Sequence, residues 1–254
     1  MKKVLCCLSP PLLLLLAACG DGHFTMNDFH RLEKIDSHVH VNSAGTALME
    51  QAQADNFKLL TINVDYPDFP PAAEQLGLAV SHEQAHPDRI AFAATFLMQG
   101  WNESNWQVKT LRHLDEAIAQ GAVAVKTWKN IGMDELAIFL DRFLNAVVDM
   151  AARMGQIQYQ SSRDREKVRS FLVKYQERIL YATDLTQAPE ANPEEFKKEA
   201  HEKWLADWKY LNMDSIMTVP QLDHSFQGLA LPKKVVEKIY RLNAEKTFPT
   251  AWQK

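Results

Sequence analysis

The stretch Lys34-Ile35-Asp36-Ser37-His38-Val39-His40-Val41-Asn42 predicts the first strand of the fold. Its alternating apolar positions and its β-branched residues are typical of a buried β-strand. Because side chains alternate between the two faces of a strand, His38 and His40 point to the same face. Two imidazoles on one face of a rigid strand provide two ligands for a divalent metal. A His-x-His pair alone is a weak motif, and its weight here comes from its place in the chain.

That place is the start of a regular alternation of strands and helices. The predicted strands cover 34–42, 57–65, 89–96, 122–128, 145–151 and 178–184, and the predicted helices cover 44–56, 72–86, 106–120, 135–143, 163–176, 196–213 and 233–246. Asp134, a capping box beginning at Ser161, and Asn192 are expected to start the helices that follow them. Strands that are hydrophobic throughout and alternate with helices predict a parallel α/β fold.

The composition is that of an ordinary globular protein. Of the 254 residues, 46% are hydrophobic and 24% are charged, which is enough for one sizeable core. The formal net charge is −4, and the sequence has no block of lysine and arginine. Nucleic acid is therefore not an expected partner.

The first residues form a different kind of segment. Met1-Lys2-Lys3 is basic, and the apolar run after it is too short to span a bilayer comfortably, as in a secretory signal peptide. Its end, Leu16-Ala17-Ala18-Cys19, resembles the bacterial lipobox. That resemblance implies cleavage before Cys19, lipidation of its thiol, and an exported lipoprotein anchored on the periplasmic side or in the outer membrane. An ordinary signal peptide with an incidental cysteine is the alternative.

The expected organisation is a signal peptide over 1–18, a tether over 19–30 and one folded domain over 31–254. All three cysteines, Cys6, Cys7 and Cys19, lie in or next to the signal segment. A metal in the folded domain must therefore be held by His, Asp, Glu or Lys.

Four segments together resemble one enzyme family. They are Ile35-Asp36-Ser37-His38-Val39-His40, Val125-Lys126-Thr127-Trp128-Lys129-Asn130-Ile131-Gly132, Ile179-Leu180-Tyr181-Ala182-Thr183-Asp184 and Phe226-Gln227-Gly228-Leu229-Ala230-Leu231-Pro232. The set is similar to the amidohydrolase superfamily, in its amidohydrolase-related branch. The resemblance implies an α/β fold of the (β/α)₈ TIM-barrel type, with a metal site at the C-terminal ends of the strands.

The resemblance also implies roles for individual residues. His38 and His40 would bind a divalent metal, with zinc as the expected ion, and Asp184 would bind the metal and act as the general base. Lys126 stands where many relatives carry a carboxylated lysine that bridges two metals. Carboxylation requires a neutral amine, and burial of a lysine favours that form. The alternatives are a structural or substrate-contacting Lys126, and a helix cap or turn at Asp184.

The implied reaction is hydrolysis of an amide, ester or lactone in a small-molecule substrate by a metal-activated water. Some relatives use the same site for non-oxidative decarboxylation, which is the alternative reaction. Strand ends supply the candidate substrate contacts Trp128, Asn130, Asp149 and Arg153. Arg153 is suited to clamp a carboxylate, or alternatively forms a surface ion pair.

The spacing departs from a complete barrel. At roughly 31 residues per strand–helix unit, residues 38–126 fit three units, as the family pattern requires. Residues 126–184 fit only about two of the four units between the fourth and eighth strands. We therefore predict a barrel truncated to about six parallel strands, with C-terminal helices, that lacks the fifth and sixth units.

The missing units would each supply a metal-binding histidine in the family. The other histidines do not replace them, because His82, His86, His113 and His201 are predicted to face solvent from helices or turns, and His224 lies in a late loop. Three hypotheses remain: a shortened hydrolase, a non-catalytic remnant or binding protein, and a sequence that is incomplete at Gly132-Met133-Asp134.

Overall fold

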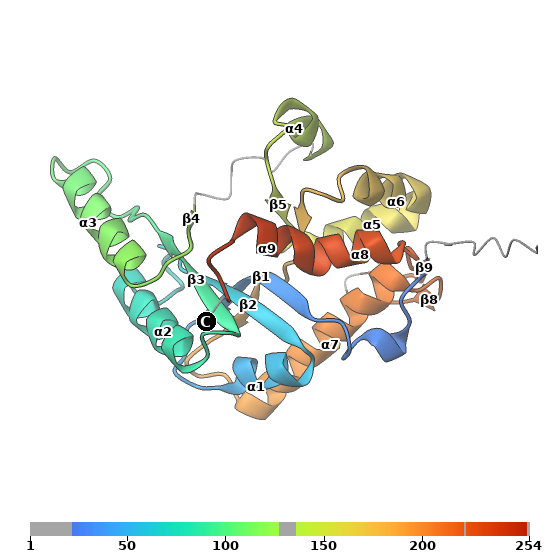
Figure 1. Ribbon diagram of the computed structural model, residues 1–254, viewed down its shortest axis with the longest axis horizontal. Coiled ribbons are helices and arrows are strands. Elements are labelled where there is room, and N and C mark those ends of the chain that lie inside the picture. Colours follow the sequence, from blue (N-terminus) through green and yellow to red (C-terminus); the bar gives the residue numbers. More distant parts are fainter. Residues whose placement is uncertain (1–21, 127–135, 221, 253–254) are drawn as a thin grey trace, which may run out of the picture.

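The described residues of the computed structural model, 22–126, 136–220 and 222–252, are built around a parallel sheet (Figure 1). Its order is β4-β3-β2-β1-β7. The strands are β1 (Lys34–Val41), β2 (Phe57–Ile62), β3 (Ile90–Thr95), β4 (Ala124–Lys126) and β7 (Leu185–Gln187). A second parallel pair consists of β5 (Val148–Asp149) and β6 (Ile179–Leu180). The predicted parallel α/β fold is confirmed.

Hydrogen bonds join the second pair to the main sheet beside β1. The Ser37 amide donates to the Tyr181 carbonyl at 3.0 Å, and the Asp184 amide donates to the His38 carbonyl at 2.9 Å. The parallel strands therefore run from β4 at one end to β5 at the other. No ladder joins β4 to β5 within the described ranges. The result is an α/β fold consistent with a truncated (β/α)₈ barrel, as the spacing predicts.

The last predicted strand, 178–184, is interrupted at Asp184. This residue has a φ of +68°, in the left-handed region that a residue with a side chain seldom adopts. β6 ends before it and β7 begins directly after it. A turn at Asp184 is one of the alternatives that the sequence leaves open, but its left-handed conformation was not predicted, because nothing in the local sequence requires it.

Helices cover both sides of the sheet, and α1 and α7 pack against each other (Figure 1). They are α1 (Ala47–Ala54), α2 (Ala72–Ala85), α3 (Trp106–Ala119), α4 (Leu136–Arg142), α5 (Met154–Arg163), α6 (Arg165–Lys174), α7 (Pro193–Asn212), α8 (Lys233–Glu237) and α9 (Asn243–Thr247). Short elements complete the fold: a 3-10 turn (Met26–Asp28), the antiparallel pair β8 (Ile216–Met217) and β9 (Phe226–Gln227), and a π-helical turn (Lys238–Leu242) between α8 and α9.

One helix start was predicted correctly and one was wrong. The Asn192 side chain accepts from the Glu194 and Glu195 amides, as expected of the cap of α7. The capping box at Ser161 is wrong, because Ser161 is buried inside α5, where its hydroxyl bonds to Tyr210 at 2.5 Å. Asp164 caps α6 instead and accepts from the Lys167 amide at 3.0 Å.

The core between the sheet and α7 is aromatic. Trp204 and Trp208 of α7 are fully buried, and Trp204 stacks on Phe57 of β2 with ring centroids 4.4 Å apart. Tyr181 and Tyr240 pack against each other beside them. The aromatic stripe of α7 therefore forms a packing surface on the outside of the sheet, as its helical spacing predicts.

Two of the histidines predicted to face solvent are buried. His82 bonds to the Ser43 carbonyl at 2.8 Å, and His113 faces inward from α3. The prediction was wrong for these two because a helical position alone does not reveal which face packs on the sheet.

Several predictions lie outside the described residues: the signal peptide and Cys19, the substrate contacts Trp128 and Asn130, the cap at Asp134 and the junction beginning at Gly132. Within the described ranges, no helix is both long and apolar enough to cross a membrane.

Candidate metal centre

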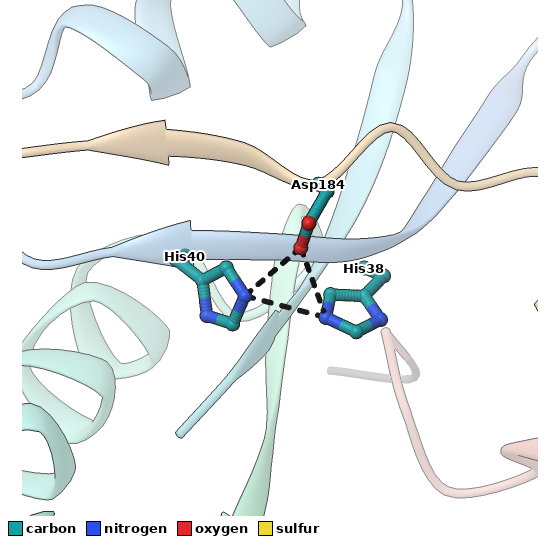
Figure 2. Close-up of side chains that lie close together, drawn as sticks. All are labelled: His38, His40 and Asp184. Atoms are coloured by element: carbon teal, nitrogen blue, oxygen red, sulfur yellow. Dashed lines mark hydrogen bonds and ion pairs between the residues drawn. The ribbon is translucent and has the colours of Figure 1, made fainter. Parts of the chain in front are cut away.

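His38, His40 and Asp184 converge on one point beside β1 (Figure 2). The Nε2 atoms of the two histidines are 3.3 Å apart. One carboxylate oxygen of Asp184 lies 3.1 Å from His40 Nε2 and 3.3 Å from His38 Nε2. Both histidines are buried, whereas Asp184 is partly exposed. Strand periodicity predicts that the two histidines share a face, and the resemblance implies Asp184 as a third ligand. The structure brings its carboxylate to the histidines from 144 residues further along the chain.

The second nitrogen of each imidazole bonds to an acceptor. His40 Nδ1 lies 2.7 Å from the Ile62 carbonyl, and His38 Nδ1 lies 3.1 Å from the Asp149 carboxylate. A carbonyl or carboxylate oxygen only accepts, so each neutral imidazole carries its proton on Nδ1. Nε2 then presents a lone pair to the convergence point. Such outer partners fix the tautomer and the ring orientation of metal-binding histidines.

Three acceptor atoms therefore face one another at contact distance: two imidazole lone pairs and a carboxylate oxygen. This arrangement needs a cation at its centre, which can be a shared proton, an ammonium group or a metal ion. Two histidines and one carboxylate are a common ligand set for a catalytic zinc, which keeps a fourth position open. The residues present thus fit a divalent metal ion.

Lys126 and Asp149 complete the immediate surroundings. Lys126 Nζ lies 3.1 Å from His38 Nε2, so the lysine at the end of β4 reaches the site. Asp149, a predicted substrate contact at the end of β5, instead lies against His38 Nδ1, where it can orient that ring. β4 and β5 border the open side of the truncated barrel. The two edge strands therefore supply side chains to the same centre.

The electrostatics of the site favour a neutral His40 imidazole and ionised carboxylates at Asp184 and Asp149. Burial lowers the pKa of His40, although Asp184 partly offsets this. The interaction with His40 is the largest cause that lowers the pKa of Asp184 to about 2, against an opposing effect of burial. Burial acts to raise the pKa of Asp149, but the His38 ring and the Ala151 amide outweigh it and the pKa is lowered. These are the protonation states that metal ligation requires.

A cavity of about 630 Å³ opens over the site. Its walls are largely apolar, with aromatic side chains at Phe69, Phe96 and Phe139, and Arg153, the residue before α5, also lines it. This size and lining suit a small-molecule ligand. The Phe69 ring packs edge-on against the His40 ring, with ring centroids 4.9 Å apart. The sequence did not single out Phe69, because it lies in a loop where no periodicity reveals its direction.

No family model matches this chain, and no curated protein matches it. A solved crystal structure of an amidohydrolase II is similar with a TM-score of 0.41 and 13% sequence identity, covering 85% of this chain and 100% of that chain. A similarity at this level assigns no function, so the case for the site rests on its geometry.

A buried carboxylate behind the site gives a pH-dependent prediction. Burial raises the pKa of Asp36 from 3.8 to about 6, against hydrogen bonds from Thr183 and Trp204. Between about pH 4 and pH 6 the folded chain keeps a proton that the unfolded chain has released, so stability falls as the pH rises. The full effect on the free energy of unfolding is about 3 kcal/mol, because a pKa difference of one unit corresponds to about 1.4 kcal/mol.

We therefore expect the free energy of unfolding of the wild type, relative to Asp36→Asn, to decrease as the pH rises from 4 to 6 and to level off above that. Urea unfolding of both proteins at pH 4, 5, 6 and 7 measures this difference. Subtracting the variant removes the contributions of the other titrating groups. A constant difference across the series would contradict the prediction.

Proposed function

We propose that the protein is a metal-dependent hydrolase that acts on a carbonyl bond in a small molecule. The observation that carries the proposal is the convergence of His38 Nε2, His40 Nε2 and an Asp184 oxygen, with both Nδ1 protons committed to acceptors outside the centre. The described part of the chain holds one such ligand set, so the proposal is for a single ion, with zinc as the first candidate.

His38, His40 and Asp184 would hold the ion, and Asp149 would orient His38. A bound divalent cation polarises a carbonyl and lowers the pKa of a nearby water. Asp184 stays ionised at neutral pH, which both a ligand and a proton acceptor require. Its partial exposure and its position in the cavity lining support a role in which the carboxylate would take the proton of the attacking water.

Lys126 and Arg153 would act on the substrate. Lys126 lines the cavity with its Nζ 3.1 Å from His38 Nε2, and Arg153 lines the same cavity. The Lys126 ammonium would bind a substrate oxygen beside the metal ligands, and the Arg153 guanidinium would bind a substrate carboxylate. Carboxylation of Lys126 is not needed for a single-ion site.

The test uses the purified protein loaded with Zn²⁺, Mn²⁺ or Co²⁺ and a panel of amides, esters and lactones. We expect turnover that a chelator removes and that returns on adding metal. Asp184→Asn is expected to lower kcat/KM by about 10²- to 10⁴-fold, the typical contribution of a general base. Asp115→Asn, an exposed substitution on α3, is the control and should leave kcat/KM unchanged.

The same assays separate the alternatives. Release of CO₂ from carboxylate substrates, without hydrolysis, would replace the proposed reaction by decarboxylation. A protein that binds metal but turns over no substrate of either kind would be a non-catalytic binding protein, and the proposal would fail.

We further propose a lipid anchor on Cys19, which rests on the lipobox-like sequence Leu16-Ala17-Ala18-Cys19. Labelled palmitate should be incorporated into the wild type and not into Cys19→Ser. Equal labelling of the two proteins would overturn the anchor and leave the proposed activity untouched.

A further inference from the structure

We propose that Asp36 is a positioning residue for the metal centre: its buried carboxylate ties the strand that carries His38 to the turn that carries Asp184. The inference rests on the proposed function and extends it to a residue that does not face the convergence point. Its basis is a set of hydrogen bonds that connects the two backbone segments on which the ligands stand.

The Asp36 carboxylate is fully buried and accepts from four directions. One oxygen accepts from the Thr183 amide at 3.0 Å and from the His38 amide at 3.4 Å. The other accepts from the Thr183 hydroxyl at 2.6 Å and from the Trp204 indole of α7 at 2.9 Å. The Asp36 side chain thus bonds to the backbone amide of the ligand His38 and to Thr183, the residue immediately before the ligand Asp184.

The turn at Asp184 needs such support. Its φ of +68° is unfavourable for a residue with a side chain and persists only where surrounding contacts hold it. The Thr183 hydroxyl, itself donating to Asp36, accepts from the Leu185 amide at 3.1 Å. The Asp184 amide donates to the His38 carbonyl at 2.9 Å. These bonds enclose Asp184 on both sides, and this conformation points its carboxylate at the two imidazoles.

β1 contains an irregularity that lets Asp36 and His38 point in different directions. Asp36 is paired with Leu59 and Val39 with Thr61, so β1 has one residue more than β2 in this interval. An extra residue of this kind is a β-bulge, which re-aims side chains and is frequent beside active sites. In a regular strand, residues two apart face the same way. Here Asp36 contacts α7, whereas His38 faces the cavity.

The test measures metal affinity and coordination apart from activity. The full-length wild type, Asp36→Asn, Thr183→Val and Thr183→Ser are titrated with Zn²⁺ against a chromophoric chelator and with Co²⁺, whose visible absorption reports the ligand geometry. Urea unfolding of the metal-free proteins at pH 7.5 measures stability separately. Asp207→Asn is the matched control, because Asp207 is also a buried carboxylate, on α7, but it accepts from the Tyr181 hydroxyl and from Lys203 and makes no bond to Thr183 or to a ligand residue within the described hydrogen bonds.

We expect Asp36→Asn and Thr183→Val to lower Zn²⁺ affinity by about 10- to 100-fold, as removal of an outer-shell partner does, and to change the Co²⁺ spectrum. Thr183→Ser keeps the hydroxyl and should retain the wild-type affinity and spectrum. Asp207→Asn should stay within about threefold of wild type, or less than about 0.7 kcal/mol, whatever its effect on unfolding.

The outcomes distinguish the two proposals. Wild-type affinity and spectrum in both Asp36→Asn and Thr183→Val would overturn the positioning role and leave the metal site standing. A wild type that binds neither Zn²⁺ nor Co²⁺ would overturn the proposed function itself. If Asp36→Asn does not fold, the contrast between Thr183→Val and Thr183→Ser decides, and equal affinities in that pair would count against the role.

Discussion

Replacing His40 with alanine is expected to abolish stoichiometric zinc binding by this protein. His40 Nε2 lies within 3.3 Å of both His38 Nε2 and the Asp184 carboxylate, so the substitution leaves only two of three ligands. Loss of an outer-shell partner alone costs about 10- to 100-fold in affinity, and loss of a ligand should exceed that. The measurement is the metal content of the purified protein by elemental analysis, followed by Zn²⁺ titration. His38→Ala should behave in the same way.

His82→Ala is the matched control. His82 is as buried as His40 and also bonds a backbone carbonyl, but it lies on α2 outside the convergence point. It should keep the metal even if it loses stability. Metal bound equally by the wild type, His38→Ala and His40→Ala would refute the assignment of the site.

Replacing Lys34 with methionine is expected to cost the largest share of folding stability of any single change considered. The Lys34 ammonium is completely buried at the start of β1 and donates to the carbonyls of Phe29, Leu32 and Asp55. Its Nζ also lies 4.6 Å from the ring centroid of Phe57. Methionine keeps the apolar stem but leaves these carbonyls without their donor.

We expect the free energy of unfolding to fall by about 2–4 kcal/mol. Each unsatisfied buried acceptor costs about 1–3 kcal/mol, and removing a buried charge offsets part of that cost. Urea unfolding measures the change. The control is Lys109→Met on α3, whose exposed lysine pairs with Glu103 at the surface and should cost less than about 1 kcal/mol. A loss for Lys34→Met no larger than that of the control would contradict the role of the buried ammonium.

The sequence alone predicted the parallel α/β class, the first four strands and the truncation. These follow from local periodicity and from the spacing between motifs, both of which are properties of a linear chain. His38 and His40 could be placed on one face for the same reason, since alternation along a strand fixes the relative direction of residues two apart. The cap at Asn192 was predictable because capping chemistry is confined to one turn.

Only the tertiary structure decided how the site is assembled. The left-handed turn at Asp184 and the bulge after Asp36 depend on contacts between segments far apart in the chain, and no local pattern encodes them. The same holds for Asp149, which the sequence placed among substrate contacts and the fold places against His38. Strand periodicity fixes a direction on one strand, whereas this metal centre requires atoms of β1 and of the turn at Asp184 to lie within 4.8 Å of one another. That convergence is set by how the strands pair and how the chain turns between them.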